Sequence, residues 1–297
     1  MSCIRIFLLF TTLYLLDGCR MQNNLNNEDN NTENNFQKIK IYSTPSAFRF
    51  AGEKIPLELS DVREKFDREL HINSYLHSST ILLLKKGNRW LPRISEILKS
   101  NGIPEDFKYL PVIESGLANA TSYKKAVGFW QLLASTAREN GLTVNNEVDE
   151  RYDPIKSTYA AIKYLKKAYK KFNSWVSAAA SYNRGIRGYE NAIKAQKIND
   201  YFNLYLNSET SRYIYRILAI KEIFENPNKY GFNLVKEDYY YQENLVSYKI
   251  SKTIPNLANW ALENNSHFKD LKRHNPWLRK NSLTIRKGRN YIIYLPN

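Results

Sequence analysis

Apolar side chains recur at helical spacing through most of residues 60–224, and no other feature of the sequence constrains the fold as strongly. The runs end at residues that stop helices, such as Asn101-Gly102 and Asn140-Gly141. Asp153-Pro154 is predicted to cap the longest helix, which extends to about Phe172. Other helices are predicted over residues 60–71, 90–99, 104–114, 135–139, 174–183 and 208–224. The predicted fold class is therefore mainly α.

The last part of the chain, residues 239–297, has a different pattern. Tyr239 to Ile250 and Asn290 to Pro296 are rich in Tyr, Val and Ile, which indicates strands. Two helical patterns lie between them, over Ile254 to Leu262 and Phe268 to His274. This β-α-α-β order resembles a LysM carbohydrate-binding module, although Ser251-Lys252-Thr253 replaces the usual Gly-Asp-Thr. A small C-terminal α+β module is predicted, which either binds glycan or only packs on the helical domain.

The N-terminus is predicted to direct export. Arg5 precedes an apolar run from Ile6 to Leu16, which is shorter than the roughly 20 residues that span a bilayer. This pattern is typical of a signal peptide, predicted over residues 1–18. Leu16-Asp17-Gly18-Cys19 resembles a bacterial lipobox, although Asp17 departs from that pattern. The resemblance implies a Cys19-lipidated protein at the periplasmic face of the outer membrane. A plain cleaved signal or a short anchor is the alternative, and the protein is then exported to the periplasm.

A flexible tether is predicted behind this anchor, over residues 19–55. Its residues 21–40 are Asn-rich and have few apolar side chains, so they bury too little surface to offset the entropy of ordering. Both cysteines, Cys3 and Cys19, lie in the leader. The mature chain is therefore predicted to have no disulfide, no cysteine nucleophile and no Cys-ligated zinc.

The charge and the histidines bear on partners and cofactors. The net charge of +15 suits an anionic cell-wall polymer or acidic lipid head groups, and no nucleic-acid motif accompanies it. The 4 histidines form no cluster with metal-ligand spacing, and no Gly-rich phosphate loop is present. We expect no metal, no cofactor and no nucleic-acid partner, and a monomer.

One acid, Glu114, stands at the end of an apolar helical run that begins after Pro104. Burial there raises the pKa of a carboxyl group, as a proton donor near neutral pH requires. A solvated glutamate at a helix end is the alternative. Pro111 falls inside the predicted helix and is expected to distort it.

Four motifs follow one another from Glu114 onward: Glu114-Ser115, Gly128 to Gln131, Tyr182-Asn183 with Gly185, and Glu209-Thr210 with Tyr213. This order resembles the lytic transglycosylase catalytic domain of glycoside hydrolase family 23, over residues 101–232. The resemblance implies a lysozyme-like helical domain, preceded by a helical extension over residues 56–100.

The resemblance also implies a reaction on peptidoglycan glycan strands. Glu114 would protonate the bond between N-acetylmuramic acid and N-acetylglucosamine, then act as base to give a 1,6-anhydro end. The substrate-binding residues would be Ser115, Ser122, Gln131, Tyr182, Asn183, Glu209 and Tyr213. Several have structural alternatives: Ser115 holds a turn, Ser122 is a solvated loop residue, and Glu209 favours a helix N-terminus. Two other functions stay open, a goose-type lysozyme-like hydrolase and an inactive cell-wall-binding protein.

Overall fold

The computed structural model describes residues 39–297, and residues 41–297 form one compact unit. The predicted signal peptide, Cys19 and most of the predicted tether lie outside the described residues. The helical part contains β1 (Arg49–Phe50), β2 (Glu53–Lys54), α1 (Ser60–Tyr75), α2 (His77–Ser100), η1 (Glu105–Tyr109), α3 (Leu110–Ser115), α4 (Ala134–Glu139), η2 (Glu150–Tyr152), α5 (Pro154–Phe172), α6 (Trp175–Arg184), α7 (Ile186–Gln196), η3 (Tyr201–Asn203), α8 (Ser208–Glu225) and η4 (Pro227–Tyr230). After η5 (Lys236–Asp238), the C-terminal module consists of β3 (Leu245–Ile250), α9 (Leu257–Glu263), α10 (Phe268–His274) and β4 (Tyr291–Pro296).

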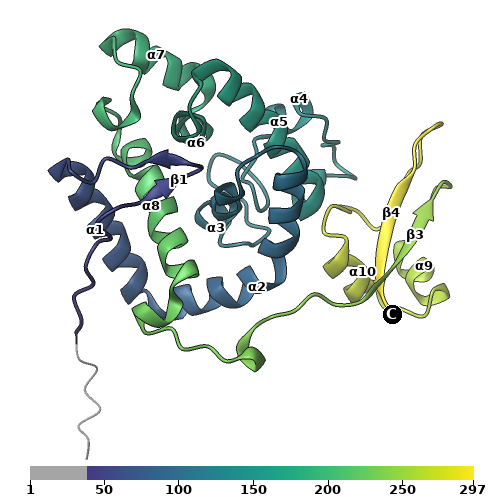
Figure 1. The fold of residues 1–297 in the computed structure, drawn as a ribbon. Coiled ribbons are helices and arrows are strands. Elements are labelled where there is room, and N and C mark those ends of the chain that lie inside the picture. Colours follow the sequence, from purple (N-terminus) through teal and green to yellow (C-terminus); the bar gives the residue numbers. More distant parts are fainter. Residues whose placement is uncertain (1–38) are drawn as a thin grey trace, which may run out of the picture. The chain divides into compact units, whose positions relative to one another are not determined.

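The short helix α3 lies near the centre of the helical part and packs against α8 (Figure 1). The longer helices bury one apolar face each: α1 packs on α8, α5 on α6, and α2 on η1. The largest fully buried side chains here include Trp130, Tyr189, Tyr213, Phe66 and Phe107. Burying a large apolar side chain contributes about 1.5–3 kcal/mol. The hydrophobic core therefore fixes the central helix from several sides.

A polar side chain, that of Asp153, caps α5. Asp153 accepts hydrogen bonds from the backbone N–H groups of Ile155 and Lys156, at 2.9 and 3.0 Å. This confirms the predicted cap of α5, and such a cap contributes about 1 kcal/mol.

However, α5 has 19 residues and α2 has 24, so the prediction of the longest helix was wrong. The predicted start of α2 at residue 90 was late because Ile81 and Leu82, in its first turns, are partly exposed and break the apolar stripe.

The segment between Pro104 and Glu114 differs from the single helix that was predicted. A 3₁₀ helix, η1, leads into α3, and Pro111 lies in the first turn of α3. Proline is tolerated there because its missing N–H has no partner inside the helix in any case. Pro111 therefore starts a helix and does not distort one. The helix α7 was not predicted.

The predicted tether does not reach residue 55. β1 and β2 form an antiparallel hairpin, in which Phe50 is fully buried. Glu53 accepts a hydrogen bond from Ser174 Oγ at 2.8 Å and another from the backbone N–H of Trp175. Residues 49–55 thus belong to the folded helical part and hold the first turn of α6.

The C-terminal module has its own small core. β3 pairs antiparallel with β4, with Ile250 opposite Tyr291, and α9 and α10 cover the pair (Figure 1). The strand β3 begins later than predicted because Tyr240 instead donates a backbone hydrogen bond to Lys85 of α2, at 3.2 Å. The module is thus α+β, as predicted. Among residues 39–297, no helix combines the length and apolar character needed to cross a membrane.

Candidate active site

Glu114 lies in the last turn of α3. The helix ends at Gly116, which adopts the left-handed conformation with φ of 61° and donates a backbone hydrogen bond to Val112 at 3.0 Å. Glycine reaches this conformation without the steric cost that a side chain imposes. The short helix and its sharp end therefore fix the direction of the Glu114 side chain.

Protein atoms surround the carboxyl group of Glu114, although the residue as a whole is only half-buried. Loss of hydration raises the pKa of Glu114 to about 7. The hydroxyl of Tyr213, which donates a hydrogen bond to Oε1, and the charge of Arg216 lower the pKa, while Glu209 raises it. At neutral pH a large fraction of Glu114 therefore carries a proton, as a general acid needs.

The loop from Gly128 to Gln131 packs beside this acid. Gly128 has φ of 79°, and a Cβ atom there would lie 2.0 Å from the carbonyl oxygen of Arg151, so only glycine fits. Trp130 is fully buried and donates from Nε1 to Thr158 Oγ1 at 2.9 Å. Phe129 is also buried, so both aromatic side chains belong to the core. Gln131 donates from Nε2 to the carbonyls of Ala120 and Gly128, at 3.1 and 2.9 Å.

The two serines predicted at the site support the backbone around it. Ser115 Oγ donates to the carbonyl of Phe129 at 2.9 Å and so ties α3 to the Gly128–Gln131 loop. Ser122 Oγ accepts a hydrogen bond from the backbone N–H of Ala126 at 3.0 Å. The Ser115 contact matches the turn-holding alternative for that residue. Ser122 is half-buried and supports the loop backbone, which differs from the solvated serine given as its alternative.

Tyr182, Asn183 and Glu209 come from α6 and α8. Tyr182 donates to the carbonyl of Trp130 at 2.7 Å, and burial together with the charge of Glu114 raises its pKa well above its usual value. Asn183 donates to Glu209 Oε1 at 3.0 Å and accepts from Thr210 Oγ1 at 2.8 Å. The structure thus brings Glu114, Tyr182, Glu209 and Tyr213 into electrostatic contact, with Asn183 bonded to Glu209.

Sequence reasoning missed three residues that hold this region. Arg151 is buried, bonds both carboxylate oxygens of Asp149, and donates to the carbonyls of Lys125 and Leu132. Thr158 accepts the bond from Trp130, and Arg216 bonds the backbone of α3. A buried ion pair leaves no periodic pattern in the sequence. Only the acidic residues next to Arg151 in the sequence could have indicated its ion pair.

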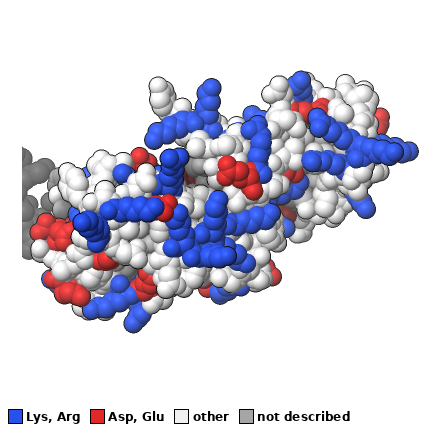
Figure 2. Space-filling view, turned by 90° about the horizontal axis from the view of Figure 1, so that it is seen from above, with Lys and Arg blue, Asp and Glu red and all other residues white. Residues whose placement is uncertain are grey.

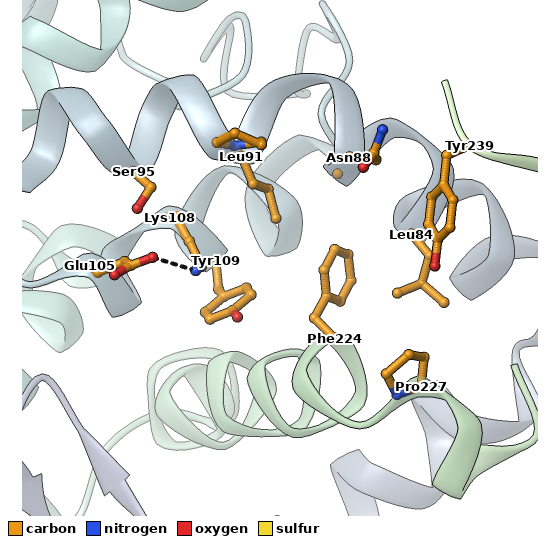
Figure 3. Close-up of a pocket in the computed structure, with 12 residues that line it drawn as sticks. Leu84, Asn88, Leu91, Ser95, Glu105, Lys108, Tyr109, Phe224, Pro227 and Tyr239 are labelled. Atoms are coloured by element: carbon orange, nitrogen blue, oxygen red, sulfur yellow. Dashed lines mark hydrogen bonds and ion pairs between the residues drawn. The ribbon is translucent and has the colours of Figure 1, made fainter. Parts of the chain in front are cut away.

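A separate pocket of about 420 Å³ lies between α2, η1 and the end of α8 (Figure 3). Leu91, Tyr109 and Phe224 line it, together with the ion pair between Lys108 and Glu105, and Glu114 is not among its lining residues. Phe224 is 11 residues from Tyr213, about 16 Å along α8. This pocket is therefore distinct from the surroundings of Glu114. Within residues 39–297, no group of three or more His, Cys, Asp or Glu is placed to hold a metal ion.

Comparison with known proteins bears on both parts of the chain. Residues 94–205 match the family described as Transglycosylase SLT domain, and residues 246–297 match the soluble lytic transglycosylase C-terminal LysM-like domain. Membrane-bound lytic murein transglycosylase D from Escherichia coli K12 is 31% identical over 198 residues. The alignment covers 64% of this chain and 43% of that relative, so the chain spans less than half the length of the relative.

A second, shorter similarity exists. A protein of Alteromonas sp. (strain M-1) that is named for tributyltin chloride resistance is 30% identical over 122 residues, 40% of this chain and 58% of that relative. The matches confirm the resemblance, the mainly α class with its lysozyme-like domain, and the LysM-like character of the C-terminal module. The chain thus carries a transglycosylase SLT domain at residues 94–205, followed by a LysM-like domain at residues 246–297.

Proposed function

We propose that this chain is a lytic transglycosylase that cleaves the glycan strands of peptidoglycan. The observation that carries the proposal is the carboxyl group of Glu114, which is surrounded by protein, bonded by Tyr213 and shifted to a pKa of about 7. The matched transglycosylase domain and the relative from Escherichia coli support the same reaction class.

The proposed reaction needs one carboxyl group and no water. Glu114 donates its proton to the oxygen that joins N-acetylmuramic acid to N-acetylglucosamine, and the bond from this oxygen to the anomeric carbon breaks. The Glu114 carboxylate then takes the proton of the muramic acid 6-hydroxyl, and that oxygen bonds to the anomeric carbon. An intramolecular nucleophile has a high effective concentration, so a second carboxylate is not required. Glu114 ends the cycle protonated, as it began.

We further propose which residues contact the sugar. Gln131, Tyr182 and Asn183 lie on the elements that surround Glu114. The donors of Gln131 and Tyr182 already bond protein carbonyls, so the side-chain oxygens of the three residues are the groups that would accept hydrogen bonds from acetamido N–H groups. Glu209 holds Asn183 at 3.0 Å, which supports a positioning role, and Tyr213 holds the acid itself. Ser115 and Ser122 would act through the backbone that they support.

The products of digestion test this proposal. Purified sacculi are incubated with the protein, and the soluble fragments are analysed by mass spectrometry. We expect 1,6-anhydro-muramic ends, which weigh one water less than reducing ends, because the sugar supplies its own nucleophile. Reducing ends would instead identify a lysozyme-like hydrolase. Binding to sacculi without any soluble fragment would identify an inactive cell-wall-binding protein.

The surface and the C-terminal module fit an anionic polymeric partner. Figure 2 shows Lys and Arg side chains spread over the face in view, with fewer Asp and Glu side chains between them. Peptidoglycan carries carboxylates on its peptides, and a basic surface raises the local concentration of such a polymer. We propose that the LysM-like domain adds glycan contacts and that the protein acts as a monomer.

We also propose a lipid anchor on Cys19, with the protein held at the periplasmic face of the outer membrane. In the Cys19→Ala variant, we expect the protein to move from the membrane fraction to the soluble fraction, because an acyl chain supplies the membrane affinity. Immunoblotting of the two fractions measures the change. Cys3→Ala, in the same leader, is the matched control and should leave the protein with the membrane. Membrane association of Cys19→Ala that equals that of the parent would contradict the anchor.

A further inference from the structure

The end of α3 that carries Glu114 is held by two cations from different helices. An α-helix leaves its last four carbonyl groups without partners inside the helix. The carbonyl of Ile113, in the last turn, accepts a hydrogen bond from Arg216 Nη2 at 2.8 Å. The carbonyl of Gly116, the residue that follows the helix, accepts one from Lys86 Nζ at 3.2 Å. Arg216 belongs to α8 and Lys86 to α2. Cations suit this end of a helix, where the macrodipole is negative.

Tyr213 and Arg216, on one face of one helix, bond Glu114 and the residue before it, respectively. Residues three apart on an α-helix are neighbours on its surface. Tyr213 donates to the carboxyl group of Glu114, and Arg216 donates to the backbone carbonyl of the residue before it. Ile214 and Ile217, between and beside them, are fully buried and fix α8 in the core. The acid is thus held at its side chain and at its backbone by a single element.

We propose that Arg216 is a positioning residue for Glu114. Arg216 ties the last turn of α3 to α8 and keeps a fixed positive charge beside the carboxyl group of Glu114. Arginine suits this role because its guanidinium stays charged and donates in several directions from a planar group. Arg216 lies outside the four sequence motifs, and its part in the reaction rests on the proposed function.

The groups that face Glu114 come from several elements. Tyr213, Glu209 and Arg216 lie on α8, and Tyr182 lies on α6. Burial raises the pKa of Glu114, and Glu209 raises it further, whereas Tyr213 and Arg216 lower it. Arg216 is the one fixed positive charge in this set. Lys86 bonds a carbonyl that lies two residues beyond Glu114.

The fixed charge matters at the point where the proton leaves. Donation to the bridging oxygen turns Glu114 into a carboxylate in a poorly hydrated place, which is unfavourable without a nearby cation. Arg216 and the Tyr213 hydroxyl both stabilise that carboxylate until it takes the proton of the 6-hydroxyl. A group that acts as acid and then as base works best when its pKa lies near the working pH.

The test compares Arg216→Gln, which removes the charge, with Arg216→Lys, which keeps it. Lys86→Gln is the matched control, because it removes the other cation at the same helix end. Release of anhydro-muramic fragments from soluble glycan strands is measured as kcat/KM between pH 5 and 9. The titration of Glu114 is followed independently by NMR of carboxyl groups labelled with ¹³C, and Glu114→Gln assigns the signal. Circular dichroism confirms that each variant is folded.

For Arg216→Gln we expect kcat/KM to fall roughly 10- to 100-fold at pH 6, because misplacement of a reacting group has effects of this order. The alkaline fall of its pH profile and the Glu114 titration should both move to higher pH, because removal of a cation favours the neutral acid. Arg216→Lys should keep the parent's titration and lose less activity. Lys86→Gln should leave the titration in place.

Three results would overturn the inference: a parent-like profile for Arg216→Gln, an equal shift in Arg216→Lys, or an equal shift in Lys86→Gln. The NMR titration also separates the two proposals. If the parent released no anhydro-muramic fragments while Arg216→Gln still shifted the Glu114 signal, the proposed reaction would be wrong and the effect of Arg216 on the acid would stand.

Discussion

Replacement of Glu114 by Gln is expected to lower the release of soluble fragments from sacculi about a thousandfold, because general acid–base catalysis by one group contributes roughly 10² to 10⁴. In the proposed reaction the same carboxyl group acts in both steps, so its loss affects protonation of the leaving oxygen and activation of the 6-hydroxyl. Quantification of anhydro-muramic fragments by mass spectrometry measures the loss. Sacculus binding should survive, since the rest of the surface is unchanged.

Glu96→Gln, at an exposed position of α2, is the matched control and should keep full activity.

The pH dependence of stability adds a second readout. The folded pKa of Glu114, about 7, lies above the ordinary value of 4.5, so the folded state binds the proton more tightly. The parent should therefore lose stability as the pH rises from about 4.5 through 7, by roughly 3 kcal/mol. Urea unfolding of Glu114→Gln should lack this loss. Digestion of sacculi by Glu114→Gln at the parent's rate would refute the assignment of Glu114 as the acid and base.

The second large effect is expected for Gly128→Ala. The added Cβ would meet the carbonyl oxygen of Arg151 at 2.0 Å, and φ of 79° disfavours any side chain. Overpacking against backbone and the left-handed conformation together should lower the free energy of unfolding by about 3–5 kcal/mol. The neighbouring Trp130 would shift with the loop, so activity should fall as well. Thermal unfolding followed by circular dichroism measures the change in stability.

Gly102→Ala separates the two causes. Gly102 has φ of 69°, and nothing lies within 4 Å of a Cβ placed there. Only the conformational cost applies, so we expect a loss of about 1 kcal/mol. Equal losses of stability in Gly128→Ala and Gly102→Ala would show that the contact with the Arg151 carbonyl does not restrict the side chain at residue 128.

Helices whose burial is periodic could be predicted from the sequence. The apolar stripe and the Asp153 cap identify α5 with correct bounds. The motif order drew attention to Glu114 and Tyr213, but their hydrogen bond appears only in the structure. Features without a period were missed. Half of the residues in the hairpin at residues 49–54 are charged, and Phe50 is the main buried one, so the hairpin resembled the polar segment before it.

Within the site, residue identity was easier to predict than residue contact. Asn183 bonds Glu209 because α6 and α8 pack against each other, and no local pattern encodes that packing. Gln131 adopts φ of 45° and directs its amide N–H groups to the carbonyls of Ala120 and Gly128. Such a backbone conformation is uncommon for residues other than glycine, and it depends on the surrounding loop.

The hairpin contact of Glu53 has a consequence for where an autonomous folding unit begins. Its carboxylate completes the first turn of α6, the helix that presents Tyr182 and Asn183, from more than a hundred positions upstream. A shortened chain that started at residue 101 would lose this cap, and it would also expose the face of α8 that α1 covers. We therefore expect the motif-bearing region to be less stable without the residues before it, because those residues hold α6 and cover α8.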